Sequence, residues 1–297
     1  MQIILFTKFF ETLEPQALGE HVAGLGYDGL DLTVRPGYPI NPDNVRTTLP
    51  PAARLWETLG LSCPMITMPT DFNDPTHAEA IAIYEAAAEA SVQVIKTGYF
   101  IFKPGMDYWQ AVDHGRRQLE GFEALSARTG VKSLHHTHSG AVLGSNCAGL
   151  MHLLQGRDPA HVGAYIDPGH LAVDGEDIDM AFAMCDEYLA AVAAKDACHL
   201  PDSRPDAPAA YGPAFVYVGE GAAPWGRVLE LLAERNFDGP LTVHTEYTAR
   251  QDVIATVGGK DQSADADAIR ARGAQQDLQF LRSRWAAIQQ ASDGAAS

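Results

Sequence analysis

Long apolar runs are absent from this chain of 297 residues. No run reaches the ~18 residues that a membrane-spanning helix needs. The opening MQIILFTKFFETLEP has a short apolar run and no basic leader. We therefore expect no membrane span, and we expect the first residues to form a strand rather than a signal peptide.

Cysteine is also scarce. The four cysteines are far apart, and none belongs to a C-x-x-C pair of the kind found in metal and redox sites. They are Cys63, Cys147, Cys185 and Cys198. We expect buried or incidental thiols, as in proteins of the reducing cytoplasm.

Positive charge is the third thing the chain has little of. Lys and Arg number 21 against 38 Asp and Glu, for a formal net charge of −17. Such a surface repels phosphate backbones and anionic lipid, so the charge argues against nucleic-acid binding, an endonuclease function included. The composition is compatible with a homo-oligomer and fits an enzyme with a neutral small-molecule substrate.

Short apolar runs alternate with longer helical patterns along the whole chain. The expected strands cover residues 2–6, 29–34, 63–68, 92–98, 131–138, 162–170, 189–196 and 240–247. The first expected helix has its apolar stripe at Leu18, Val22 and Leu25 and stops at Gly26. The other expected helices cover 43–59, 76–90, 108–129, 146–155, 177–187, 224–235 and 263–291. Residues 200–223, rich in Pro, Asp and Ala, are expected to form a loop.

This alternation predicts a single (β/α)8 barrel. Strictly alternating strands and helices imply a parallel sheet with right-handed crossovers, and one such barrel takes ~250 residues. A doubly wound sheet usually has a glycine-rich turn after its first strand, and none is present here. No linker divides the chain, so we expect one domain over residues 1–291 and a frayed tail over 292–297.

Ionisable residues gather where the last four expected strands end, which is where barrel enzymes hold their active sites. They are His135, His136, His138, Asp167, His170, Lys195, Asp196, His244 and Glu246. Alternate residues of a strand share a face. We therefore expect His138, Asp167, Lys195 and Glu246 to converge from four neighbouring strands.

Structural roles remain open for several of these residues. His135 has the opposite parity, and we expect it to pack against a helix. Lys195 and Glu246 also fit a structural ion pair. Asp167 also fits a helix cap, and His170 also fits a residue that supports the site without binding a ligand.

The chain resembles the xylose-isomerase-like superfamily of sugar isomerases and epimerases. DPGH (167–170) is similar to its D-x-x-H motif after strand six, HHTHSG (135–140) to the end of its strand five, and VAAKD (192–196) to its strand-seven K-D. VGEGAAPW (218–225) resembles its L-G-E-G-x-x-D-W loop, and LTVHTEY (241–247) resembles its strand-eight end in Glu. GLDLTVRPG (29–37) resembles the second strand of one bacterial subgroup.

The resemblance implies a divalent metal held by Glu, Asp, His and Glu. Asp167 and Glu246 match two of these positions, whereas His136 stands at the first Glu position and Ala193 at the His position. Asp167, Glu246 and one or both of His136 and His138 form a candidate set for Mn²⁺, Zn²⁺, Co²⁺ or Mg²⁺. The alternative is that the Lys195 ammonium replaces the metal and stabilises an oxyanion on the substrate.

The expected function is isomerisation or epimerisation of a sugar, or of a sugar-derived keto-polyol, through an enediolate. Glu246, Lys195 and His170 are the expected catalytic residues. Substrate contacts are expected from His138, Tyr99, Arg35 and Trp225, although core packing is the stronger interpretation of Trp225. Two alternatives stay open: a lyase acting on a keto-sugar or keto-inositol in the same site, and a sugar-binding barrel that has lost catalysis.

Overall fold

Eight parallel strands close into a barrel in the computed structural model, which describes residues 1–202, 209–247 and 264–295. Their order around the barrel is β1-β10-β7-β6-β5-β4-β3-β2, and every neighbouring pair is parallel. The strands are β1 (Gln2–Phe6), β2 (Gly29–Thr33), β3 (Ser62–Thr67), β4 (Val94–Lys96), β5 (Lys132–His136), β6 (Val162–Ile166), β7 (Leu189–Ala194) and β10 (Pro240–Val243). The prediction of a (β/α)8 barrel is confirmed.

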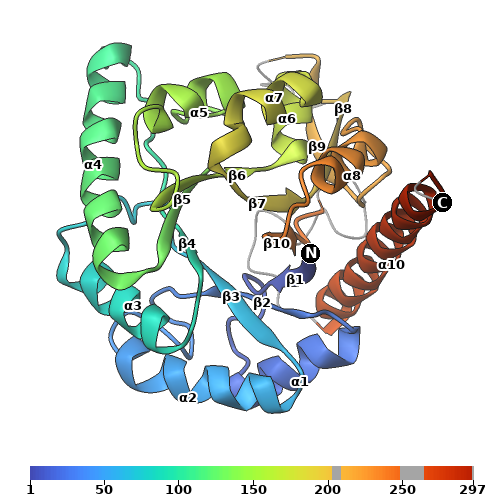
Figure 1. Ribbon diagram of the computed structural model, residues 1–297, viewed down its shortest axis with the longest axis horizontal. Coiled ribbons are helices and arrows are strands. Elements are labelled where there is room, and N and C mark those ends of the chain that lie inside the picture. The colour runs from blue at the N-terminus through green and yellow to red at the C-terminus, as the bar shows by residue number, and fades with distance from the viewer. Residues whose placement is uncertain (203–208, 248–263, 296–297) are drawn as a thin grey trace.

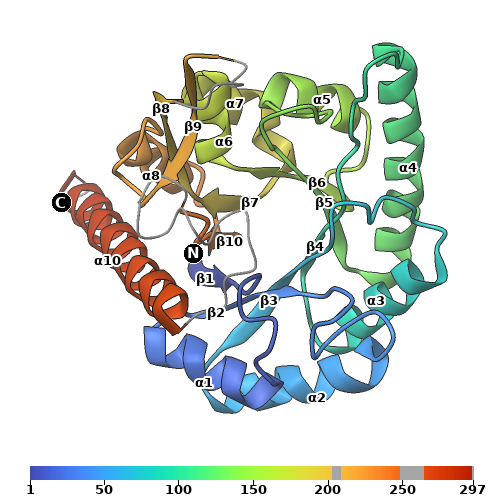
Figure 2. The same ribbon diagram turned by 180° about the vertical axis from the view of Figure 1, so that it is seen from behind.

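Helices surround these strands on the outside of the barrel, as Figures 1 and 2 show. They are α1 (Pro15–Leu25), α2 (Val45–Thr58), α3 (Ala78–Glu89), α4 (Tyr108–Thr129), α5 (Cys147–Leu154), α6 (Pro168–Asp174), α7 (Ile178–Cys185), the 3-10 turn η1 (Asp186–Tyr188), α8 (Trp225–Glu234) and α10 (Ala264–Ala295). Side-chain caps begin several of them: Asp107 accepts from the Gln110 N–H and Asn146 from the Gly149 N–H. Within the described ranges, no helix has the length and hydropathy to cross a bilayer.

The expectation of a loop over 200–223 is wrong for residues 200–201 and 211–216, which are strand, whereas residues 203–208 lie outside the described residues. An antiparallel hairpin lies outside the barrel there, formed by β8 (Asp196–Pro201) and β9 (Tyr211–Val216). The stretch reads as a loop because it holds several prolines, but a two-stranded ribbon has free edges where a residue without an N–H is tolerated. Pro213 occupies such a place in β9.

A small apolar cluster fills the barrel interior below its carboxyl-terminal mouth. Its members are Ile4, Met65, Val94, Leu134, Tyr165, Ala190, Ala191 and Ala193. Strand β7 contributes only alanines to this cluster, and Ala191 pairs with Tyr165 of the neighbouring β6. The four cysteines are free thiols, and only Cys198 is not fully buried. The last helix continues past the expected end at 291 to Ala295, and 296–297 lie outside the described residues.

Asp277 ties α10 to the carboxyl-terminal side of the barrel. Its carboxylate is fully buried and accepts hydrogen bonds from the Tyr247 hydroxyl (2.7 Å) and the Val218 N–H (2.9 Å). Burial raises the pKa of Asp277 to about 7. A folded-state pKa above the unfolded value means that this group stabilises the fold below pH ~4 and that the contribution is lost as pH rises through ~7.

We therefore expect Asp277→Asn to stabilise the protein relative to wild type at pH 8 and to have little effect at or below about pH 4, where Asp277 is protonated in the folded chain. The gain at pH 8 is at most about 4 kcal/mol, at ~1.4 kcal/mol for each pKa unit. Thermal unfolding at the two pH values measures it, with the exposed Glu187→Gln as the control. An equal effect of Asp277→Asn at both pH values would contradict the expectation.

Candidate active site at the mouth of the barrel

A cavity of about 110 Å³ lies at the carboxyl-terminal mouth of the barrel. All eight barrel strands, or the residues that directly follow them, contribute to its wall. The lining residues are Phe6, Lys8, Arg35, Thr67, Thr70, Lys96, Tyr99, His136, His138, Tyr165, His170, Lys195, His244 and Glu246. The structure thus brings together every site residue predicted from the sequence except Asp167, which lies directly behind the wall, and Trp225.

Glu246 is held between two ammonium groups. Its Oε2 lies 2.6 Å from Lys195 Nζ, and its Oε1 pairs with Lys8 Nζ from the end of β1. Burial alone would raise the pKa of Glu246, but the charges of Lys195 and Lys8 outweigh burial and hold that pKa well below its usual range. Glu246 is therefore an ionised carboxylate at neutral pH, stabilised by cations that a substrate oxygen can compete for.

His170 links Lys195 to the β5 side of the cavity. Lys195 Nζ donates to His170 Nε2 at 3.2 Å, so the ring proton lies on Nδ1, which is 2.8 Å from Ser139 Oγ. The His138 ring lies over His170 with centroids 3.9 Å apart. Burial, followed by the charge of Lys195, lowers the pKa of His170 well below its usual range. Both the geometry and the electrostatics keep His170 as a neutral imidazole whose Nε2 accepts a hydrogen bond from Lys195.

Asp167 has two roles, one for each carboxylate oxygen. Oδ1 accepts the His170 N–H at 3.0 Å and caps α6, as the sequence allowed. Oδ2 is buried and has no hydrogen-bond partner among the described residues. It lies 3.4 Å from His136 Nε2 and 3.7 Å from His170 Nε2. His136 Nδ1 in turn bonds the Tyr99 hydroxyl at 2.7 Å, which directs Nε2 toward Asp167.

His135 and His244 complete the set of buried imidazoles. His135 stacks on Phe100 and places Nε2 3.3 Å from the Leu143 carbonyl, away from the cavity, as strand parity predicted. His244 lines the cavity, and its Nε2 bonds the Tyr165 hydroxyl at 2.8 Å. Burial lowers the pKa of His244, so it too is neutral.

From the first half of the chain the sequence analysis predicted only Arg35 and Tyr99, and it missed several other residues. Lys8, Thr67, Thr70 and Lys96 line the cavity, and Asp31 lies buried behind it, accepting a hydrogen bond from Thr67 Oγ1 at 2.9 Å. Burial raises the pKa of Asp31 to about 7 and lowers the pKa of Lys96 to about 7. The sequence did offer a signal: Asp31 and Lys96 are each the only charged residue of an apolar strand. Burying such a charge costs free energy unless the charge has a function.

Trp225 and Asp196 support the site from behind. Trp225 is buried in the core, and its indole Nε1 donates to the Lys195 carbonyl at 3.2 Å. The structure therefore places Trp225 behind Lys195 and away from the cavity wall. The Asp196 carboxylate accepts four backbone N–H groups, from Ala197, Gly219, Gly221 and Ala223, at 2.8 to 3.0 Å. This explains why a K-D pair and a G-E-G loop occur together in the sequence.

A four-ligand divalent metal site of the kind implied by the resemblance does not fit these residues. The described part of the chain holds no group of three or more His, Cys, Asp or Glu side chains arranged to bind a metal. The unpaired His136 Nε2 and Asp167 Oδ2 offer two donors, whereas Zn²⁺ takes four ligands and Mn²⁺ commonly six. Glu246, the third expected ligand, has its two oxygens on two ammonium groups. The positive charge beside Glu246 comes from Lys195 and Lys8.

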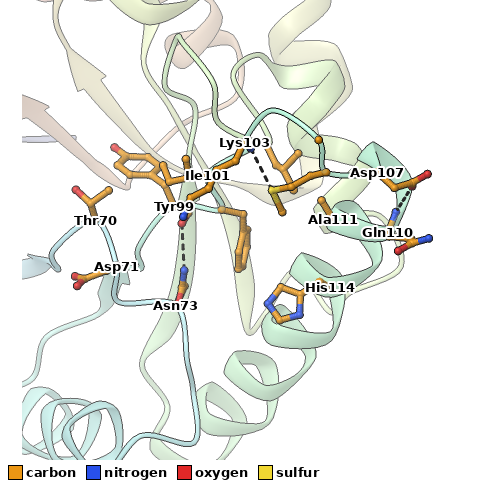
Figure 3. Close-up of a pocket in the computed structure, with 14 residues that line it drawn as sticks. Thr70, Asp71, Asn73, Tyr99, Ile101, Lys103, Asp107, Gln110, Ala111 and His114 are labelled. Atoms are coloured by element: carbon orange, nitrogen blue, oxygen red, sulfur yellow. Dashed lines mark hydrogen bonds between the residues drawn. The ribbon is translucent and has the colours of Figure 1, made fainter.

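A larger open groove of about 630 Å³ adjoins the mouth on the α4 side, and Figure 3 shows its lining. Thr70 and Tyr99 border both the groove and the cavity. Asn73 Nδ2 donates to the Tyr99 carbonyl at 3.3 Å, which fixes the segment between the two spaces. Most of the other groove residues come from the loop after β4 and from α4, among them Ile101, Lys103, Met106, Gln110 and His114; Asp71 follows β3 and Leu143 follows β5.

The chain belongs to the xylose isomerase-like TIM barrel family, whose model matches residues 20–284. No curated protein matches it. A D-psicose 3-epimerase from Clostridium cellulolyticum H10 superposes with a TM-score of 0.66 at 14% identity, covering 96% of this chain and 99% of that one. A 3-keto-D-glucoside 4-epimerase from E. coli gives 0.66 at 15%, covering 95% and 99%. A probable 3-DHS dehydratase from Bacillus anthracis gives the same values. At these identities the superpositions establish the fold, and the predicted family is confirmed.

Proposed function

We propose that this protein is an isomerase or epimerase of a ketose, or of a keto-polyol derived from a sugar, and that it works by proton transfer through an enediolate. One observation carries the proposal: the Glu246 carboxylate and the Lys195 ammonium meet at 2.6 Å in the cavity at the barrel mouth. Proton abstraction next to a carbonyl needs a base for the C–H proton and a cation for the oxygen. This pair supplies both.

The reaction begins when the substrate carbonyl oxygen accepts a hydrogen bond from Lys195 Nζ. This contact draws the ammonium away from Glu246, whose basicity rises because one of its two cations is now shared. Glu246 then takes the proton from the adjacent carbon, the C–H electron pair forms the C=C bond of the enediolate, and the carbonyl π pair moves to the oxygen. Lys195 stabilises the resulting oxyanion, and neutral His170, 3.2 Å from Lys195, orients a substrate hydroxyl.

Polar groups around this centre suit a sugar. Arg35, Thr67, Tyr99 and His138 line the same cavity and offer donors and acceptors to hydroxyl groups. A neutral polyol also suits a protein with a net charge of −17. Both carboxylate oxygens of Glu246 are paired with lysine ammonium groups. The lysines therefore take the electrostatic role that a divalent ion has in a metal-dependent enolisation.

The test is incubation of the protein with a panel of ketoses and keto-inositols in D₂O. We expect deuterium at the carbon beside the carbonyl together with an epimer or an aldose, and we expect EDTA to leave the rate unchanged. Glu246→Gln is expected to abolish the exchange. Proton NMR measures exchange and product together, and elemental analysis accompanies it.

Other results would replace the proposal. A product that has lost water would identify a lyase using the same first step. Binding of a ketose without exchange or turnover would identify a sugar-binding barrel. Loss of activity in EDTA, restored by Mn²⁺, would return the electrostatic role to a metal.

A further inference from the structure

Lys96 is a buried amine inside the cavity that the reaction above does not use. It is the last residue of β4, is 3% exposed, and lines the same cavity as Glu246 and Lys195. Its Nζ lies over the Tyr99 ring, 3.6 Å from the centroid. Lys195 and Lys8 each pair with Glu246, whereas no carboxylate among the described residues lies at ion-pair distance from Lys96. Its amine is therefore free to act on a ligand.

The order of strands places Lys96 and Glu246 on opposite walls of the barrel mouth. In the ring of strands, β7, β6 and β5 separate β10 from β4 on one side, and β1, β2 and β3 separate them on the other. Glu246 follows β10 and Lys96 ends β4, and both reach the same cavity. A planar enediolate lying between these walls would present one face to the carboxylate and the other face to the amine.

The local charges allow Lys96 to gain and lose a proton near neutrality. Burial, followed by the charge of Arg35, lowers the pKa of Lys96 to about 7, although Asp31 and Glu246 oppose the shift. The amine and ammonium forms are then both populated at neutral pH, as an acid–base residue requires.

We propose that Lys96 is the second proton-transfer residue of this site, facing Glu246 across the substrate, and that the reaction is therefore an epimerisation. The inference rests on the enediolate chemistry proposed above. A 1,2-isomerisation moves a proton along one face of the enediolate and needs one base. Inversion of a carbon centre needs removal from one face and delivery to the other.

The proton and electron balance is as follows. Glu246 takes the proton from carbon on one face, the C–H electron pair forms the C=C bond, and the carbonyl π pair moves to the oxygen that Lys195 stabilises. The Lys96 ammonium then delivers its proton to the same carbon from the opposite face, the C=O bond re-forms, and Lys96 is left as the neutral amine. Glu246 returns its proton to solvent and Lys96 takes one up. In the reverse direction neutral Lys96 is the base and protonated Glu246 is the acid.

The test is Lys96→Met in D₂O, with each epimer supplied separately. We expect epimerisation to fall by about 100-fold or more, within the range for loss of a general acid or base. Exchange into the epimer that Glu246 deprotonates should stay within about 10-fold of wild type, because Glu246 and Lys195 are intact. Exchange into the other epimer should be lost. Lys132→Met, on the adjacent β5 but at its opposite end, is the matched control and should leave both rates unchanged.

Chemical rescue keeps the proposal testable if the methionine variant folds poorly. Ethylamine added to Lys96→Ala should restore epimerisation, which a structural role would not predict. Normal epimerisation by folded Lys96→Met, or equal loss of exchange into both epimers, would overturn the assignment of Lys96. A wild type that exchanges deuterium but yields only an aldose would leave the proposed function standing and remove this inference. A wild type with no exchange would remove the proposed function itself.

Discussion

Lys195→Met is expected to lower kcat by about 100-fold or more, the range seen when an oxyanion-stabilising donor is lost. Lys195 is 4% exposed and contacts the two groups that define the reaction, Glu246 at 2.6 Å and His170 at 3.2 Å. Methionine fills a similar volume but cannot donate to an oxygen. The developing charge on the substrate would then lack its nearest cation.

The same substitution should leave thermal stability nearly unchanged or higher. Glu246 keeps Lys8 as a partner, so the loss of Lys195 does not leave a buried carboxylate without a cation. Charged groups held in a partly dry site are commonly kept at some expense of stability. Methionine also retains apolar contact with Phe215, over whose ring Lys195 Nζ lies at 4.1 Å.

Steady-state kinetics and thermal unfolding on one preparation decide between the two roles of Lys195. Lys195→Arg is the companion variant, because it keeps the charge while changing its position, and it should recover only part of the lost rate. Full activity of Lys195→Met with a large fall in melting temperature would show that the ion pair with Glu246 is structural, and the catalytic assignment would then be wrong.

Asp196→Ala is expected to destabilise the fold by about 3 kcal/mol or more, because buried donors left without an acceptor cost ~1–3 kcal/mol each. Four backbone N–H groups share this carboxylate, and the side chain is fully buried. Gly221 approaches so closely that a Cβ there would meet Asp196 Oδ1 at 2.2 Å. Any side chain at position 221 would therefore collide with the Asp196 carboxylate, so this loop requires glycine there.

Asp196→Asn should be almost as damaging as Asp196→Ala. Oδ1 accepts from Ala197 and Ala223 and Oδ2 from Gly219 and Gly221, so an amide NH₂ in either orientation would face two donors. At ~2–4 °C per kcal/mol, we expect the melting temperature to fall by roughly 6–12 °C.

The exposed Asp186→Ala is the control for this experiment. It removes a surface ion pair with Arg235 and should change stability by less than ~1 kcal/mol. A melting temperature of Asp196→Asn close to that of wild type would mean that the loop is held by other contacts.

The sequence by itself determined the barrel and one half of its site. Period-two and period-3.6 patterns are local properties, so strands such as Gln2–Phe6 and helices such as Tyr108–Thr129 could be predicted within a few residues. Strand parity likewise separated His136, which faces the cavity, from His135, which packs outward. The hairpin β8–β9 was not predicted, because prolines indicate a loop when the partner strand is unknown.

Only the tertiary structure decided which charges meet. Lys8 and Glu246 are 238 residues apart in sequence, and no local pattern relates them; closure of the ring between β1 and β10 brings them together. The metal ligands implied by the family motif stand in order along the chain, but the ammonium groups beside Glu246 change what that carboxylate can bind. Likewise the position of Lys96 opposite Glu246 follows from the order of strands around the barrel. Ionic interactions depend on distance and burial, and in this protein both are set by ring closure.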